Sequence, residues 1–222
     1  MIRAFIFDLD GTLLDSEVLW VEATHELLRE LGHELTRDDA VEMVYGKSWH
    51  DVYAAIRGRF AGLTMPREAM ERDLSQRMHP LRRTRKLSID GSVSLLKRLA
   101  RSHPVCIVSG SPRGDLVEAL DILGIAGDIA FFLSSGDYAP GKPSPAGFLS
   151  AARRLGVLPA ECVVFEDSAA GVAAAKAAGM RCVALVRPGA PVQDVSAADL
   201  RLADLGGFSP RLVDPEWPGD VD

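Results

Sequence analysis

Residues 2–15 read IRAFIFDLDGTLLD, and the rest of the chain is organised around this stretch. Residues 2–7 are mostly branched and aromatic and end at a turn signal, which is typical of a buried β-strand. Asp8 and Asp10 follow two positions apart, so on an extended backbone both side chains leave the same face. Acids at the open end of a parallel strand face the crevice where open α/β sheets bind ligands. The stretch therefore predicts a polar site at the end of a buried strand.

Two interpretations of this acidic pair stay open at this point. Clustered carboxylates repel one another unless positive charge lies between them, and Mg²⁺ held by oxygen ligands would supply that charge. The alternative is an ordinary Asp-rich turn, because Asp and Gly are common turn residues. Polar residues at the ends of the other predicted strands would favour a metal site over an ordinary turn.

The composition is that of a globular protein with an acidic balance. The chain has 222 residues, 47% of them hydrophobic and 25% charged, and its formal charge is −6. This balance argues against nucleic acid or an anionic membrane as a partner. No apolar run reaches the length of a membrane span, and the N-terminus lacks the basic and apolar regions of a signal peptide. We expect a cytoplasmic protein, as a monomer or a weak homodimer.

The three cysteines, Cys106, Cys162 and Cys182, all fall in apolar segments. An odd number of cysteines inside predicted core strands favours free, buried thiols in a reducing compartment. A catalytic thiol is the alternative, but no partner histidine is recognisable.

The segment after the first strand is predicted to be helical throughout. Amphipathic spacing, glycine breaks and a proline start signal predict helices at 17–31, 36–45, 48–60 and 66–78.

From residue 89 onward short apolar strands alternate with helices. The strands are predicted at 105–109, 129–133, 162–165 and 182–186, and the helices at 92–101, 115–123, 146–155 and 169–178. This alternation predicts an α/β fold, a Rossmann-like parallel sheet with helices on both faces. The predicted domains are an α/β core at 1–15 and 87–222 and an inserted four-helix cap at 16–86.

Polar side chains follow each strand of the predicted core. Asp8 and Asp10 follow the first strand, and Lys142 lies after the third. The second strand ends with Ser109, Gly110 and Ser111, and the fourth with Glu166, Asp167 and Ser168. A parallel sheet brings these ends to one edge. A carboxylate can be a nucleophile, a second can be an acid and base, and a lysine and a hydroxyl can hold phosphate oxygens. Each residue alone has a structural explanation, but together they favour phosphoryl transfer.

The same residues resemble the four motifs of the haloacid dehalogenase (HAD) superfamily, most of whose members are Mg²⁺-dependent phosphohydrolases. The motifs read DLDGT at 8–12, then Ser109, Lys142-Pro143 and Glu166-Asp167. A helical insertion after the first motif resembles subfamily I, which includes β-phosphoglucomutase and small sugar-phosphate phosphatases. The resemblance implies a phosphoric monoester hydrolase that passes through an aspartyl-phosphate.

The resemblance also implies a role for each motif residue. Asp8 would be the nucleophile, and Asp10 would act as acid and then base while its backbone carbonyl ligates Mg²⁺. Glu166 and Asp167 would complete the metal site with Asp8. The phosphoryl group would be bound by Ser109 and Lys142, and Lys142 would also offset the charge of the carboxylates. Thr12 and Gly110 would lie in the loops that support the substrate.

Substrate specificity is expected in the cap. The candidate contacts are Trp20, Lys47, Ser48, Trp49 and His50. A tryptophan would give a sugar or another small organophosphate a flat apolar contact. The alternative is that both tryptophans pack inside the cap's own core.

We therefore expect a Mg²⁺-dependent phosphomonoesterase acting on a small phosphorylated metabolite such as a sugar phosphate. A phosphosugar mutase is the first alternative. Mutases of the subfamily carry a histidine where this chain has Trp20 and an arginine where it has Trp49, which weakens that alternative. A non-catalytic protein that binds a phosphorylated ligand is the second, but such a protein needs neither a cap nor Asp10.

Overall fold

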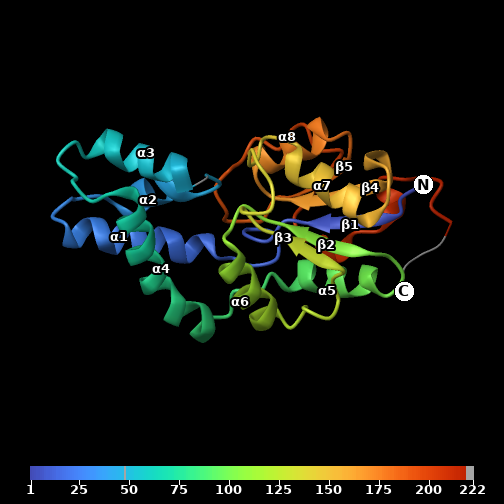
Figure 1. The fold of residues 1–222 in the computed structure, drawn as a ribbon, viewed down its shortest axis with the longest axis horizontal. Helices are drawn as coiled ribbons and strands as arrows, with labels where there is room; N and C mark the ends of the chain where they lie inside the picture. The colour runs from blue at the N-terminus through green and yellow to red at the C-terminus, as the bar shows by residue number, and fades with distance from the viewer. Residues whose placement is uncertain (48, 219–222) are drawn as a thin grey trace. The chain divides into compact units, whose positions relative to one another are not determined.

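A computed structural model describes residues 1–47 and 49–218 of the chain, and within them six strands form one parallel sheet (Figure 1). The strands are β1 (Ala4–Phe7), β2 (Val105–Val108), β3 (Phe131–Leu133), β4 (Cys162–Glu166), β5 (Arg181–Leu185) and β6 (Leu200–Leu202). Their order is β3-β2-β1-β4-β5-β6, so β1 lies inside the sheet between β2 and β4. The predicted α/β fold with a parallel sheet is confirmed.

Helices cover both faces of the sheet, as Figure 1 shows for α5 and α6 on one side and α7 and α8 on the other. Their bounds are α5 (Asp90–Ala100), α6 (Arg113–Leu123), α7 (Ala146–Leu155) and α8 (Ala169–Ala177). Gly124 and Gly156 end α6 and α7 in the left-handed conformation, which glycine adopts without strain. Three short 3₁₀ helices complete the described part of this region, at Pro159–Glu161, Leu205–Gly207 and Pro210–Leu212.

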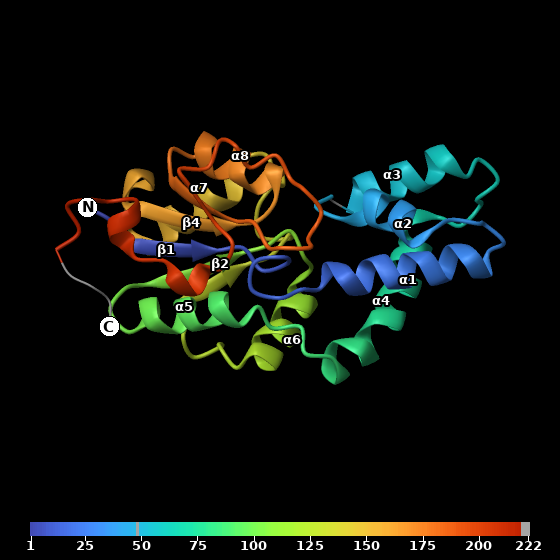
Figure 2. The ribbon, with the colours of Figure 1, turned by 180° about the vertical axis from the view of Figure 1, so that it is seen from behind.

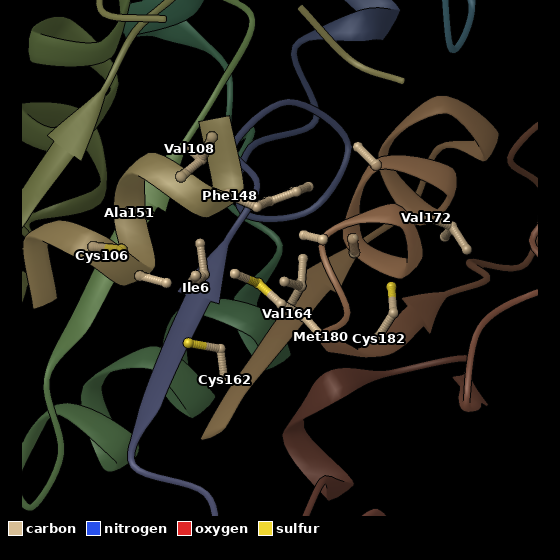
Figure 3. Packing of buried hydrophobic residues seen from close by; sticks show 14 of the residues in the cluster. Ile6, Cys106, Val108, Phe148, Ala151, Cys162, Val164, Val172, Met180 and Cys182 are labelled. Atoms are coloured by element: carbon tan, nitrogen blue, oxygen red, sulfur yellow. The ribbon is translucent and has the colours of Figure 1, made fainter. Parts of the chain in front are cut away.

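The face under α7 and α8 is a continuous apolar layer (Figure 3). Alternate strand residues such as Ile6, Val108 and Val164 pack there against Phe148 of α7 and Val172 of α8. The three cysteines belong to this layer and are free and buried, as predicted. Burial raises the pKa of the Cys162 thiol to about 12, so it behaves as a small apolar side chain rather than as a nucleophile.

The opposite face is aromatic. Phe7 stacks on Phe165 with ring centroids 4.4 Å apart, and Phe165 meets Phe208 edge to face at 4.9 Å. The C-terminal segment runs back along β1 and α5 (Figure 2), where Trp217 packs against Phe5. Because both faces of β1 are buried, the strand has no polar position until Asp8.

Residues Asp15–Leu87 form a second compact unit, separate from the unit made of Met1–Leu14 and the chain from Ser88 onward. We call these the helical unit and the sheet unit. The described residues of the helical unit form α1 (Glu17–Glu30), α2 (Arg37–Val44), α3 (Trp49–Arg59) and α4 (Arg67–Thr84). Thr36 begins α2 with a capping box, in which its hydroxyl accepts from the Asp39 N–H. That the helical unit is a cap stays a prediction.

Most element boundaries differ from those predicted by one or two residues, and the largest difference is at the end of the last helix of the helical unit. The first strand begins at Ala4 rather than at residue 2. The last helix of the helical unit continues to Thr84 although Pro80 lies inside it, so the predicted end near residue 78 is wrong. A proline removes one helical hydrogen bond, but Met78 and Arg82 are both buried on the same face of this helix, and that packing continues past the proline.

No helix among residues 1–47 and 49–218 is long and apolar enough to cross a membrane.

Candidate active site

The candidate site lies where β1 and β4 end side by side. The two strands pair in parallel register with Phe7 opposite Phe165, so Asp8 and Glu166 come next to each other at the carboxyl edge of the sheet. Strands β2 and β3 lie on one side of β1, and strands β4, β5 and β6 lie on the other, so the strand order reverses direction at β1. Such a switch point is where open α/β sheets bind ligands. The expected meeting of the strand ends is therefore seen in the structure.

Lys142 joins the two acids that follow these strands. Its Nζ donates to Asp8 Oδ1 and, at 2.5 Å, to Glu166 Oε1. All three side chains are shielded from water, with exposed fractions of 13% for Lys142, 8% for Asp8 and 1% for Glu166. Buried charges of this kind are costly unless each one is paired and hydrogen-bonded.

The electrostatics of this cluster show an excess of negative charge. Burial lowers the pKa of Lys142, but attraction to Asp8 and Glu166 outweighs that effect and holds the pKa above its usual value. Lys142 therefore stays cationic. Burial raises the pKa of the Asp8 carboxyl, and the charges of Glu166 and Asp10 raise it further, against the lowering effect of Lys142. Lys142 thus does not fully offset the two buried carboxylates and the neighbouring Asp10, which favours further positive charge at this cluster.

The loop after β4 is built around Glu166. Its Oε2 accepts three hydrogen bonds of 2.9 Å, from the N–H groups of Asp167 and Ser168 and from the Ser168 hydroxyl. Ser168 also caps α8 by accepting from the Gly171 N–H at 3.0 Å. A Cβ on Gly171 would come within 1.7 Å of Glu166 Oε1, so this helix start approaches the carboxylate as closely as glycine allows.

The loop after β1 is tied to the same region. Thr12 is fully buried, and its hydroxyl donates to Asp167 Oδ1 at 3.0 Å. Gly11 has φ +85°, and a Cβ there would come within 2.1 Å of Asp167 Oδ2. Thr12 thus lies against a predicted metal ligand, although it was predicted as a substrate residue.

Asp10 lies on the β2 side of the site. Its Oδ2 accepts hydrogen bonds from the hydroxyls of Ser109, at 3.2 Å, and Ser111, at 2.6 Å. Ser109 is buried, and its carbonyl accepts from the Tyr138 hydroxyl at 3.0 Å. The structure thereby brings Asp8, Asp10, Ser109, Lys142, Glu166 and Asp167 into one region of the sheet unit. Apart from the two serines that flank it, Gly110 has no described residue within 4 Å of where a Cβ would stand.

Three of these residues have the donor set of a Mg²⁺ site. Carboxylate oxygens of Asp8, Glu166 and Asp167 lie within 4.8 Å of one another. Mg²⁺ is a hard cation that takes oxygen ligands, so this set fits it, and the excess negative charge fits it as well.

The other predicted substrate residues belong to the helical unit. The rings of Trp20 and Trp49 lie 5.7 Å apart, and the buried Trp49 Nε1 has no hydrogen-bond partner among the described residues. Lys47 Nζ donates to the Glu42 carbonyl at 2.6 Å, and His50 lies near Arg67. Ser48 lies outside the described residues. The ring pair fits the alternative that the tryptophans pack against each other.

Two residues at the site had no predicted role. They are Ser111 and Tyr138, which contact Asp10 and the Ser109 backbone. The spacing Ser109-Gly110-Ser111 could have drawn attention to Ser111, because side chains two positions apart after a strand share a face. No comparable pattern marks Tyr138.

Comparison with known proteins places the chain in a family. A haloacid dehalogenase-like hydrolase family model matches residues 2–179. Validoxylamine A 7'-phosphate phosphatase of Streptomyces hygroscopicus subsp. limoneus is 32% identical over 220 residues, covering 98% of each chain. Fructose-1-phosphate phosphatase YqaB of Escherichia coli (strain K12) is 31% identical over 80% of this chain and 93% of its own.

A solved structure supports the same fold. β-Phosphoglucomutase of Clostridium difficile superposes with a TM-score of 0.79, covering 97% of this chain and 96% of that one, at 23% identity. The family match and the phosphatase relatives confirm the predictions of the family and of an enzyme of the HAD-like phosphatase class. The chain belongs to the haloacid dehalogenase-like hydrolase family.

Proposed function

We propose that the protein is a Mg²⁺-dependent phosphomonoesterase that hydrolyses a small phosphorylated metabolite, such as a sugar phosphate, through an aspartyl-phosphate on Asp8. The observation that carries this proposal is the buried cluster in which Lys142 joins Asp8 and Glu166 beside Asp167. An ion pair with only a structural role would not need three carboxylates. It would also not need to bury more negative charge than the single lysine offsets. A phosphoryl group and a metal ion are the partners that such a cluster suits.

Each residue of the cluster has a part in this reaction. Asp8 attacks phosphorus, and the bond to the ester oxygen breaks. Asp10 gives that oxygen a proton and later takes one from the water that attacks the phosphoryl-enzyme. Lys142 and Ser109 donate hydrogen bonds to the phosphoryl oxygens, where charge is greatest. Mg²⁺, held by Asp8, Glu166 and Asp167 together with the Asp10 backbone carbonyl, would neutralise charge on the phosphoryl group.

The substrate class follows from the relatives and from the helical unit. By their names, the two relatives above are phosphatases of validoxylamine A 7'-phosphate and of fructose 1-phosphate. We propose that the helical unit is a cap and that Trp20, Lys47, Ser48 and Trp49 supply its substrate contacts. A mutase is not favoured, since no observation in the described residues supports rephosphorylation of an intermediate. A cytoplasmic location and a monomer or weak homodimer stay predictions.

Phosphate release from a panel of small esters tests this function. Wild-type protein and Asp8→Asn are assayed with Mg²⁺ and with chelator. We expect Mg²⁺-dependent release by the wild type and a loss of about 10³-fold or more in Asp8→Asn, since the amide is no nucleophile. The absence of release from every ester by folded wild-type protein would contradict the proposal. Release that persists in Asp8→Asn would contradict the role of Asp8.

A further inference from the structure

We propose that Ser111 is a positioning residue, whose hydroxyl holds the Asp10 carboxylate in the orientation needed for proton transfer. The inference rests on the proposed function, in which Asp10 protonates the leaving oxygen. It goes beyond that function because it gives a role to a side chain that the sequence motifs leave out.

Two serine hydroxyls bind the same oxygen of the Asp10 carboxylate. Ser111 Oγ donates to Asp10 Oδ2 at 2.6 Å, and Ser109 Oγ donates to the same oxygen at 3.2 Å. An aspartate carboxyl group rotates easily about its terminal torsion, which has only broad preferences. Two donors on Oδ2 restrict that rotation and so fix where the other oxygen, Oδ1, can point. The shorter of the two hydrogen bonds is the one from Ser111.

A serine hydroxyl has one proton, so Ser109 can donate fully to only one acceptor at a time. Ser109 Oγ has one proton to donate, and it also accepts a hydrogen bond of 2.9 Å from the Ser111 N–H. When Ser109 gives its proton to a phosphoryl oxygen, as the proposed function requires, it can no longer donate to Asp10. Ser111 is then the one of these two donors that still holds Oδ2 while the ester bond breaks.

Ser111 itself is held by its backbone. Its N–H is engaged by Ser109 Oγ, and its carbonyl accepts from the Ser135 N–H at 3.1 Å. The next residue, Pro112, caps α6 with φ −60°, the value that its ring favours. The backbone carbonyl of Ser109 also accepts a hydrogen bond, from the Tyr138 hydroxyl. A hydroxyl placed by such supports can orient a catalytic group more tightly than one on an unsupported loop.

The test uses esters that differ in how much they need a proton donor. In a series of substituted phenyl phosphates, a nitrophenolate leaves without protonation, whereas a methoxyphenolate or an alkoxide needs a proton from Asp10. We expect Ser111→Ala to lower kcat/KM about 10- to 100-fold for alkyl phosphates and progressively less toward nitrophenyl phosphate, where the loss stays below about 3-fold. The parameter kcat/KM includes leaving-group departure, so it reports the step that Asp10 serves.

Three further variants serve as controls. Ser111→Thr keeps the hydroxyl and should restore activity toward alkyl phosphates. Ser111→Cys, a weaker donor of similar size, replaces the alanine variant if that variant melts early, with the same expected trend along the series. Ser135→Ala removes an exposed serine side chain nearby and should leave every ester unchanged.

The outcomes separate this inference from the function on which it rests. Equal losses for all esters would overturn the positioning role and indicate a general structural or phosphate-binding role for Ser111. No loss with any ester would overturn it as well. Because phenyl phosphates carry no sugar hydroxyls, a graded loss within that series excludes a direct contact of Ser111 with the sugar. No hydrolysis by the wild type would overturn the proposed function and this inference together.

Discussion

Two ion pairs, one in the sheet unit and one in the helical unit, lie in different surroundings. In the sheet unit, Lys142 pairs with Asp8 and Glu166 away from water. In the helical unit, ion pairs such as Arg77–Glu30, with exposed fractions of 25% and 60%, lie at the surface. Surface pairs contribute little to stability, whereas buried charges are costly and are retained where they serve chemistry. The contrast supports the proposal that the sheet unit performs the reaction.

Removing the buried lysine should have the largest effect. Lys142→Met leaves the buried Asp8 and Glu166 carboxylates without their cation. We expect activity to fall about 10²- to 10³-fold and the free energy of unfolding to fall by about 3 kcal/mol. Phosphate release and urea unfolding measure the two effects.

Lys176→Met is the matched control for this prediction. Lys176 bonds both carboxylate oxygens of Asp199 at 2.7 and 2.6 Å, but the pair is about one-third exposed on each side. We expect a loss of about 1 kcal/mol or less and unchanged activity. Equal destabilisation by the two variants would contradict the contrast between buried and exposed pairs.

The close approach of α8 to Glu166 gives the second prediction. Gly171→Ala forces a Cβ into the carboxylate, so we expect a loss of about 1–3 kcal/mol in chemical unfolding. Gly114 occupies a similar position early in α6. Outside its own helix and chain neighbours, no atom of the described residues lies within 4 Å of where its Cβ would stand. Gly114→Ala should therefore stabilise the protein, by up to about 1 kcal/mol. A neutral Gly171→Ala would mean that the loop after β4 adapts easily.

The hydrogen bond from Thr12 to Asp167 gives a smaller, metal-specific prediction. Thr12→Val removes the donor but keeps the shape of the side chain. We expect the Mg²⁺ concentration for half-maximal activity to rise about 10-fold, because groups that orient metal ligands contribute on this scale. Thr12→Ser, which keeps the hydroxyl, should behave like the wild type in the same Mg²⁺ titration. A rise in substrate KM at saturating Mg²⁺ would instead favour the predicted substrate role.

The surface pairs of the helical unit should give the smallest effect. Arg77→Gln removes the hydrogen bonds to Glu30 and Asp73. We expect the melting temperature to fall by about 2 °C or less, and the difference to shrink at about 1 M salt because exposed charges are screened. A large, salt-independent loss would show that this unit also depends on its ion pairs.

The residues at the carboxyl edge of the sheet were predictable, because the carboxyl ends of parallel strands lie at the same edge. Asp8, Ser109 and Glu166 follow apolar runs, so recognising those runs as parallel strands places all three at one edge. Lys142 was predictable as the single lysine of its loop, and the family resemblance implies that it offsets the carboxylates, as its pairing with Asp8 and Glu166 bears out. The geometry of that contact was not predictable, because it depends on how the loop folds. The bonds of Ser111 and Tyr138 depend on the same kind of loop geometry.

The helical unit was predictable in its elements rather than in its packing. Helical spacing and the break at Gly46 predict α2 to within a residue at each end. The continuation of α4 past Pro80 was missed, because tertiary burial of Met78 and Arg82 outweighs a local breaker. Periodicity also does not tell a tryptophan that contacts substrate from one that packs on another ring, as Trp20 and Trp49 do.

Trapping the covalent intermediate tests the central claim most directly. The protein is mixed with Mg²⁺ and a hydrolysed ester, quenched in acid during turnover, and analysed by mass spectrometry of the intact chain and its peptides. We predict one added phosphoryl group on the peptide that contains Asp8, and none in Asp8→Asn. Turnover with no covalent phosphoryl group, or with the group on another residue, would contradict the assignment of Asp8 as the nucleophile.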